Sequence, residues 1–129
     1  MPKYLPLEIE PTIKASLSDL LDFHWGVAAV RASFLMADPN KALEISFDGQ
    51  CIVRLVDEMA LSTEEDDSPN EGLVSDHFAY GVEGALFYRV QSEAFKTVYK
   101  NCAHYRFITG WTCLDIVTSA EPHFKVIQR

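Results

Sequence analysis

The sequence has few cysteines and no long hydrophobic run, and both facts limit what the protein can be. Its three cysteines are an odd number without a C-x-x-C spacing, which argues against a disulfide framework and a zinc ribbon. The longest nearly uncharged apolar stretch, residues 25–36, contains Arg31 and is too short to span a membrane. The N-terminus lacks the apolar segment of a secretory signal. We therefore expect a cytoplasmic protein with unpaired thiols and no membrane partner.

Lysine and arginine are absent from the stretch that carries the whole net charge. Of 19 acidic residues, eight lie between Asp57 and Asp76, a stretch without a single lysine or arginine. The remainder of the chain holds eleven acids and eleven bases, so it is balanced. Binding to a phosphate backbone requires clustered lysines and arginines. We therefore expect no nucleic-acid partner.

Catalytic and cofactor motifs are also missing. The sequence contains no G-x-S-x-G elbow, no S-x-x-K motif and no glycine-rich phosphate loop. The four histidines lack the spacing of a helical zinc site, and the acidic stretch lacks the spacing of a calcium loop. Cysteines in apolar runs usually pack as inert hydrophobic residues. We therefore expect neither metal nor cofactor, and we favour a protein that is not an enzyme.

Helical patterns cover two segments. Residues 1–11 carry three prolines and are expected to form an extended lead-in. Apolar residues at helical spacing follow, and we expect a helix at about 12–23. A second helix is expected at about 92–101, where Ser92 is suited to be the N-cap.

Strand patterns dominate the rest of the chain. They cover residues 27–36, 43–47, 51–56, 78–88, 104–109, 113–118 and 123–127. The first of these segments also fits a helix, and we assign it to a strand because a turn and a clear strand follow it. Asp48-Gly49 predicts a hairpin between 43–47 and 51–56, and 51–56 is expected to lie in the centre of its sheet because it is apolar on both faces.

The sum is an α+β fold. We expect a single domain over 1–129, with a mostly antiparallel sheet of six or seven short strands, two helices and an acidic loop at about 62–72. One parallel strand pair across 84–109 is the alternative. The expected core comprises Leu17, Leu21, Phe34, Ile45, Phe47, Val53, Leu55, Phe87, Phe107 and Ile116.

Two groups of polar residues are candidate binding sites. The first group is the acidic loop, which we expect to be solvated and to engage a basic partner protein, as a small inhibitor or immunity protein would. Its candidate residues are Glu64, Glu65, Asp66, Asp67 and Glu71. We favour this site because the charge concentration is an observation, whereas the second site depends on an unknown strand order.

The second candidate site is a cluster on the sheet face that would bind a small anion or carry a small enzyme's chemistry. Each arginine in it stands between apolar neighbours in an expected strand. Its candidate residues are Arg54, Tyr88, Arg89, His104, Tyr105 and Arg106. The alternative is that these arginines pair with Glu44, Asp57 or Asp115. Trp111, in a turn, is either an exposed contact residue or a lid over the core, and we favour the lid.

Overall fold

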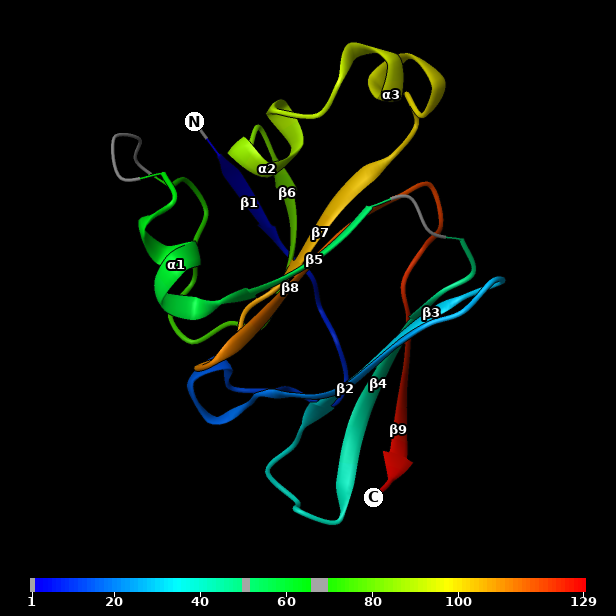
Figure 1. Cartoon of the computed structure of the whole chain (residues 1–129). Coiled ribbons are helices and arrows are strands. Elements are labelled where there is room, and N and C mark those ends of the chain that lie inside the picture. Colours follow the sequence, from blue (N-terminus) through cyan, green and yellow to red (C-terminus); the bar gives the residue numbers. More distant parts are fainter. Residues whose placement is uncertain (1, 50–51, 66–69) are drawn as a thin grey trace.

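Antiparallel strands in two sheets form most of the structure (Figure 1). The computed structural model describes residues 2–49, 52–65 and 70–129, and these ranges contain nine strands and three short helices. The five-stranded sheet has the order β1 (Lys3–Pro6), β6 (Ala79–Glu83), β7 (Ala103–Phe107), β8 (Thr112–Thr118) and β5 (Ile52–Asp57). The four-stranded sheet has the order β2 (Leu20–Trp25), β3 (Val30–Leu35), β4 (Lys41–Phe47) and β9 (His123–Gln128). The prediction of a single α+β domain with mostly antiparallel strands is confirmed.

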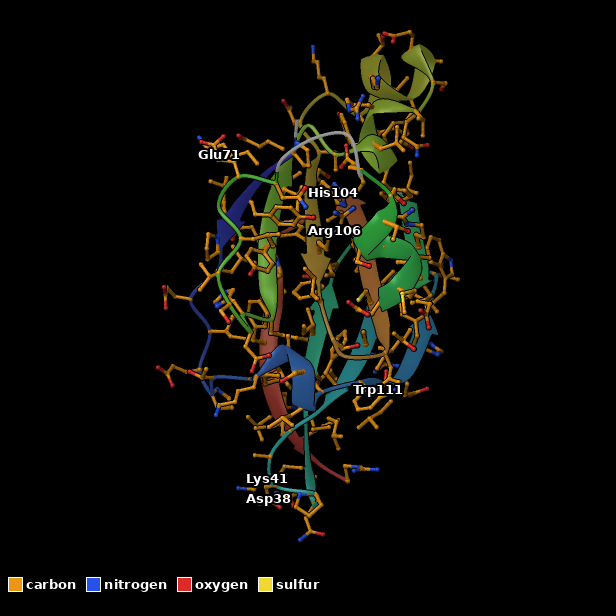
Figure 2. All side chains as sticks on the ribbon, turned by 90° about the vertical axis from the view of Figure 1, so that its left-hand side faces the viewer. Asp38, Lys41, Glu71, His104, Arg106 and Trp111 are labelled. Carbon is orange, nitrogen blue, oxygen red and sulfur yellow. The ribbon has the colours of Figure 1, made fainter. Side chains whose placement is uncertain are left out.

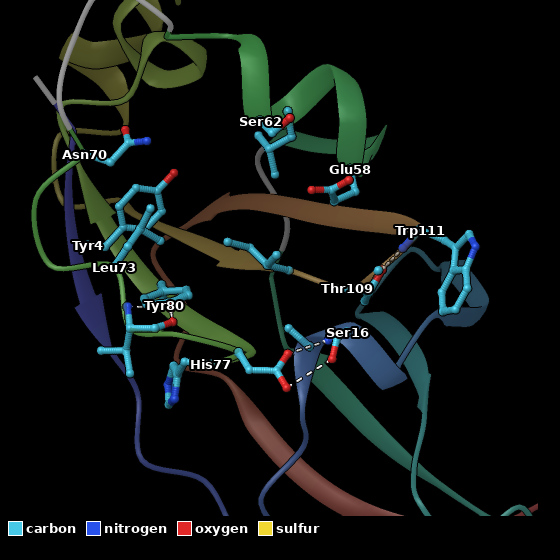
Figure 3. Close-up of a pocket in the computed structure, with 16 residues that line it drawn as sticks. Tyr4, Ser16, Glu58, Ser62, Asn70, Leu73, His77, Tyr80, Thr109 and Trp111 are labelled. Atoms are coloured by element: carbon cyan, nitrogen blue, oxygen red, sulfur yellow. Dashed lines mark hydrogen bonds between the residues drawn. The ribbon is translucent and has the colours of Figure 1, made fainter.

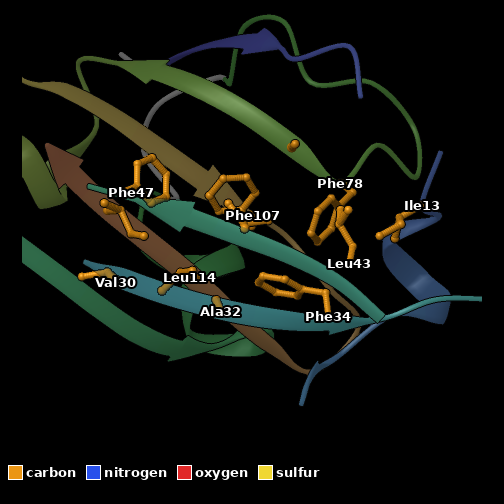
Figure 4. Packing of buried hydrophobic residues seen from close by; sticks show 12 residues of the cluster. Ile13, Val30, Ala32, Phe34, Leu43, Phe47, Phe78, Phe107 and Leu114 are labelled. Atoms are coloured by element: carbon orange, nitrogen blue, oxygen red, sulfur yellow. The ribbon is translucent and has the colours of Figure 1, made fainter. Parts of the chain in front are cut away.

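The hydrophobic core lies between the inner faces of the two sheets (Figure 4). In β3 and β4 the buried residues alternate with more exposed ones, as expected for strands with one face on a core. Five predicted core residues are fully buried: Phe34, Ile45, Phe47, Phe107 and Ile116. Val53 and Phe87 are half-buried. Leu17, Leu21 and Leu55 are exposed, so the prediction was wrong for these three.

The predicted helix at 12–23 is absent. The chain forms one 3-10 turn at Ala15–Leu17 and then strand β2, which pairs with β3. Polar side chains bind the backbone in this segment: Ser18 donates to the carbonyl of Leu35, and Asp19 accepts from the N–H groups of Leu20 and Thr112. Such side-chain bonds compete with the main-chain hydrogen bonds of a helix. The hydrogen bonds between β2 and β3 then stabilise the extended conformation more than the local pattern favours a helix.

The hairpin predicted at Asp48-Gly49 does not form, because β4 and β5 belong to different sheets. Strand β9 takes the place beside β4 and sets Lys125 opposite Glu44. Strand β5 pairs with β8 at the edge of the five-stranded sheet, so the prediction of a central strand was also wrong. The first residue of the predicted strand, Cys51, lies outside the described residues. The chain changes sheets between the two strands, as it does at the corners of β-sandwiches.

Two other local predictions agree with the structure at least in part. The ambiguous 27–36 segment forms strand β3, and the β3–β4 turn is closed by Asp38, whose carbonyl accepts from the N–H of Lys41 (Figure 2). Helix α3 (Glu93–Val98) is shorter than predicted. Its N-cap is Ser92, as predicted, and the Ser92 hydroxyl accepts from the N–H of Phe95.

The end of the 78–88 segment is helical rather than extended. It forms α2 (Leu86–Arg89) after Gly84, which has a φ of 76°. Strands β6 and β7 on either side of the two helices pair antiparallel, so the parallel alternative was wrong. No helix in the described ranges is long and apolar enough to cross a membrane.

We predict a large loss of stability for one core candidate and a small loss for another. Phe107→Ala removes a ring with 0% exposure that contacts Phe34, Phe47 and Phe78, and it should lower the free energy of unfolding by about 3–5 kcal/mol. Leu55→Ala, at a residue with 48% exposure on an edge strand, should cost less than about 1 kcal/mol. Equilibrium urea unfolding of both variants measures this. Equal losses would contradict the assignment of β5 to the sheet edge.

Candidate functional site

Two of the three candidate arginines converge on one buried carboxylate. Asp115 lies on the outer face of the five-stranded sheet, and the strand register sets Arg54 of β5 and Arg106 of β7 directly beside it. Arg54 donates to Asp115 Oδ2 from Nη2 and Nε at 2.7 and 3.0 Å. Arg106 donates to Oδ1 from Nε at 2.7 Å. Asp115 is fully buried and Arg106 is only 2% exposed, so the pairing compensates charges that would be costly alone.

His104 and Tyr4 complete this cluster. His104 Nε2 lies 2.6 Å from Asp115 Oδ1, and Arg106 Nη1 donates to the Tyr4 hydroxyl at 2.7 Å. Figure 2 shows His104 and Arg106 side by side on the same sheet face. Burial of Asp115 opposes its ionisation, but the hydrogen bond from His104 and the charge of Arg106 outweigh this and lower its pKa to about 2. Asp115 therefore stays ionised over the physiological range.

The predicted anion site is thus only partly assembled, and its charges are already compensated. Arg54, Arg106 and His104 come together as predicted, with Asp115, the partner named in the alternative. Arg89 lies instead in helix α2, and Tyr88 lies below the ammonium of Lys96. Tyr105 points to the opposite face and packs against Phe47 in the core, because neighbouring residues in a strand face opposite sides.

The first two predicted partner-binding acids are engaged within the chain. Glu64 binds Arg54 at 2.5 Å, and Glu65 binds Arg89 at 2.8 Å. Their side chains are 17% and 8% exposed, which differs from the expected solvated loop. The reason is that arginines outside the acidic stretch reach into it, which the sequence pattern did not show.

The remaining predicted acids lie further along the segment. Glu71 is exposed, and its backbone joins the edge of β1: its carbonyl accepts from the N–H of Tyr4, and its N–H donates to the carbonyl of Pro2. Asp66 and Asp67 lie outside the described residues.

A pocket of about 630 Å³ adjoins the buried cluster (Figure 3). Its floor is the outer sheet face with Tyr4, Tyr80 and Ile108. One wall is helix α1 (Glu58–Thr63), and the facing wall is the loop over residues 70–77. Sequence reasoning missed the pocket, because its walls are far apart in the chain. The only available signal was that two of its lining residues, Glu58 and Asp76, belong to the acidic stretch.

Hydrogen bonds hold the loop wall in place. Asp76 has a φ of 58°, and its two carboxylate oxygens accept from the N–H and the hydroxyl of Ser16 at 2.7 and 3.0 Å. These bonds lower the pKa of Asp76. The Tyr80 hydroxyl accepts from the N–H of Val74 and donates to its carbonyl, and His77 Nε2 lies 3.1 Å from the carbonyl of Leu7. The left-handed backbone at Asp76 is therefore retained by specific contacts.

The opposite end of the pocket combines a carboxylate and an indole. The N–H of Glu58 donates to the carbonyl of Trp111 at 2.7 Å, and the N–H of Trp111 donates to the hydroxyl of Thr109 at 3.0 Å. Asp57 caps the helix by accepting from the N–H of Met59. Trp111 is 57% exposed, so it is not the core lid that we favoured but fits the exposed alternative.

The remaining reactive groups offer little chemistry. The Cys113 thiol is fully buried, and burial raises its pKa. Cys102 lines a second pocket of about 360 Å³ with Tyr88 and His104. Within the described ranges, no three side chains of histidine, cysteine, aspartate or glutamate gather as metal ligands would.

Comparison with known proteins adds no functional assignment. The chain matches no protein-family model, no curated protein and no solved structure. The argument about function therefore depends on the residues of the site.

We predict that the buried carboxylate of Asp115 contributes to the free energy of unfolding and causes part of its loss at acidic pH. Asp115→Asn leaves Arg54 and Arg106 without their shared countercharge and should cost about 3–5 kcal/mol of unfolding free energy. The folded-state pKa of Asp115 lies near 2, below its ordinary 3.8, so its contribution is present above about pH 4 and is lost as the pH falls toward 2. Urea unfolding between these pH values measures the loss, expected to be roughly 2 kcal/mol in the wild type.

The matched control for this experiment is Asp48→Asn, at a side chain that is 81% exposed. This variant should keep the wild-type stability and the wild-type acid dependence. An Asp115→Asn variant that retains the full acid dependence would show that other carboxylates cause it.

We also predict that Cys113 reacts slowly in the folded protein. In a Cys51→Ser/Cys102→Ser variant it is the remaining cysteine, and its thiol is buried with a raised pKa. A thiol reagent should label the unfolded variant fully and the folded variant only as fast as the domain opens. Rapid stoichiometric labelling of the folded variant would instead identify a reactive thiol.

Proposed function

We propose that this protein is a non-catalytic binding module that engages a basic partner protein, as small inhibitor or immunity proteins do. The observation that carries the proposal is the pocket beside α1. The described residues that line it include Glu58 and Asp76 but no lysine or arginine. Its helix wall and most of its loop wall belong to the stretch between Asp57 and Asp76, which holds the entire net charge of −8. The odd number of cysteines supports a cytoplasmic setting, where thiols stay reduced.

The distribution of ion pairs supports an outward negative potential on this face. Glu64 and Glu65 are compensated by arginines. Within the described part of the chain, Asp57, Glu58 and Glu71 form no salt bridge with a lysine or arginine, whereas the charge of Lys14 stabilises the Asp76 carboxylate. Uncompensated charge of one sign raises association rates with an oppositely charged partner and selects against partners of like charge.

The composition of the pocket supports recognition rather than catalysis. Its histidine, His77, is engaged with the carbonyl of Leu7, and its Asp76 carboxylate is engaged with Ser16. The charged groups of the buried cluster are held by Asp115. A rigid floor, an acidic rim and an exposed indole are features of a contact surface.

The test compares two double variants with equal changes in charge. Glu58→Gln/Glu71→Gln removes two acids from the proposed face, and Glu8→Gln/Glu121→Gln removes two exposed acids elsewhere. Each variant and the wild type are immobilised, and a lysate of the native source is applied at low and high salt. We expect a basic protein to be retained by the wild type and the control at low salt, and to be released as salt screens the charges.

The face variant should lose this partner, with binding weakened by roughly tenfold or more in a direct titration of the purified pair. Equal binding by the two double variants would refute the proposed face. A partner that is acidic, or that binds independently of salt, would refute the electrostatic basis of the proposal.

A further inference from the structure

The strongest unassigned feature is the pairing of a carboxylate with an exposed indole at one end of the pocket. Glu58 and Trp111 are far apart in the sequence, yet a main-chain hydrogen bond of 2.7 Å joins them. Both line the pocket, where Figure 3 shows the Glu58 carboxylate on the α1 wall and Trp111 at the neighbouring end. The backbone of Trp111 is fixed a second time through Thr109. The main chains of the two residues are therefore held side by side before any ligand arrives.

Glu58 differs from the other carboxylate of the pocket in its availability. Both oxygens of Asp76 accept hydrogen bonds from Ser16, so that carboxylate holds the loop wall in place. Within the described ranges, the Glu58 carboxylate has no salt-bridge partner, and it is only half-buried at the start of α1. Glu58 is consequently the charge in the pocket that a ligand cation can neutralise.

We propose that this pocket receives an arginine side chain of the basic partner, with its guanidinium between the Glu58 carboxylate and the Trp111 indole. The inference rests on the proposed function, because it specifies what that partner presents. A guanidinium donates two parallel hydrogen bonds to a carboxylate, and its weakly hydrated planar face stacks on an aromatic ring. A lysine ammonium is a strongly hydrated point charge and uses this pair less well.

The rest of the pocket suits the remainder of such a ligand. Leu61 and Ile108 supply apolar surface for the methylene stem of the arginine. Ser62 and Asn70 supply polar groups toward the far end, as Figure 3 shows. A volume of about 630 Å³ is in the range of pockets that hold drug-sized ligands, so it accommodates the arginine together with its neighbouring residues. The arginine is then the anchor of a short partner segment.

The test uses three capped peptides that differ in one side chain: acetyl-Gly-Arg-Gly-amide, its lysine analogue and its citrulline analogue. Citrulline keeps the shape of arginine but lacks the charge. The protein carries Trp25→Phe, which leaves Trp111 as the remaining tryptophan and its fluorescence as the signal. We expect saturable binding of the arginine peptide, affinity lower by roughly threefold or more for lysine, and no binding of citrulline.

Single variants then locate the site, with amide chemical shifts as a signal independent of the indole. Glu58→Gln and Trp111→Leu should each weaken arginine-peptide binding, the former by roughly tenfold. The control Glu121→Gln, at an exposed acid outside the proposed face, should change it less than about twofold, as expected for a screened exposed charge. Thermal unfolding of each variant verifies that the fold is intact.

Three results would overturn the inference: equal binding of arginine and citrulline, undiminished binding by Glu58→Gln, or shifts confined to residues outside the pocket. Each leaves the proposed function standing if the basic partner still depends on the Glu58/Glu71 charges. Conversely, an arginine-specific pocket without any captured basic protein would refute the proposed function and retain the pocket's ligand chemistry.

Discussion

The fully buried carboxylate of Asp115 is the interaction on which the outer half of this fold depends. It joins β5, β7 and β8 through two arginines, and each arginine extends the connection further. Arg54 binds Glu64 and lies 4.4 Å from the centre of the Phe87 ring, so both the end of α1 and helix α2 are fixed over the sheet. Arg106 binds the hydroxyl of Tyr4 and so fixes β1. The pocket has a defined floor because this charge is buried with its partners rather than exposed.

The acidic stretch has two distinct uses in the structure. Glu64 and Glu65 are internal ties that attach the segment to arginines of other elements. Glu58 lines the pocket without a salt-bridge partner among the described residues, Glu71 is exposed on the same segment of the chain, and Asp76 shapes the pocket wall. A run of like charges therefore contains both structural and outward-facing members, and their roles follow from which of them an arginine reaches.

Much of the fold was predictable from the sequence, because alternation and turn chemistry are local. Strands β8 and β9 were identified by their strand patterns, β3 by the turn and the clear strand that follow it, and the start of α3 by Ser92. The helix at 12–23 failed because part of this segment pairs with the next strand, β3, and the central position of 51–56 failed because its partner β8 is distant in the sequence.

The same limit applies to the site. Arg54, Arg106, His104 and their partner Asp115 were all recognisable as residues that needed partners, since unpaired buried charge is costly. Their strand neighbours were not recognisable, so Arg89 and Tyr105 were grouped with them in error, whereas Tyr88 meets His104 only at the second pocket. The pocket escaped prediction altogether, because no local pattern connects Tyr4, Glu58 and Trp111.

The bond between Arg106 and Tyr4 spans 102 positions of the chain, and this separation determines how the pocket is linked to folding. Contacts of such long range form only when most of the domain is already in place. The floor of the pocket therefore exists in the native state and is absent from partially folded forms in which β1 has detached. A ligand that binds there selects the complete domain, and its binding energy adds to the cooperative stability of both sheets rather than to one loop.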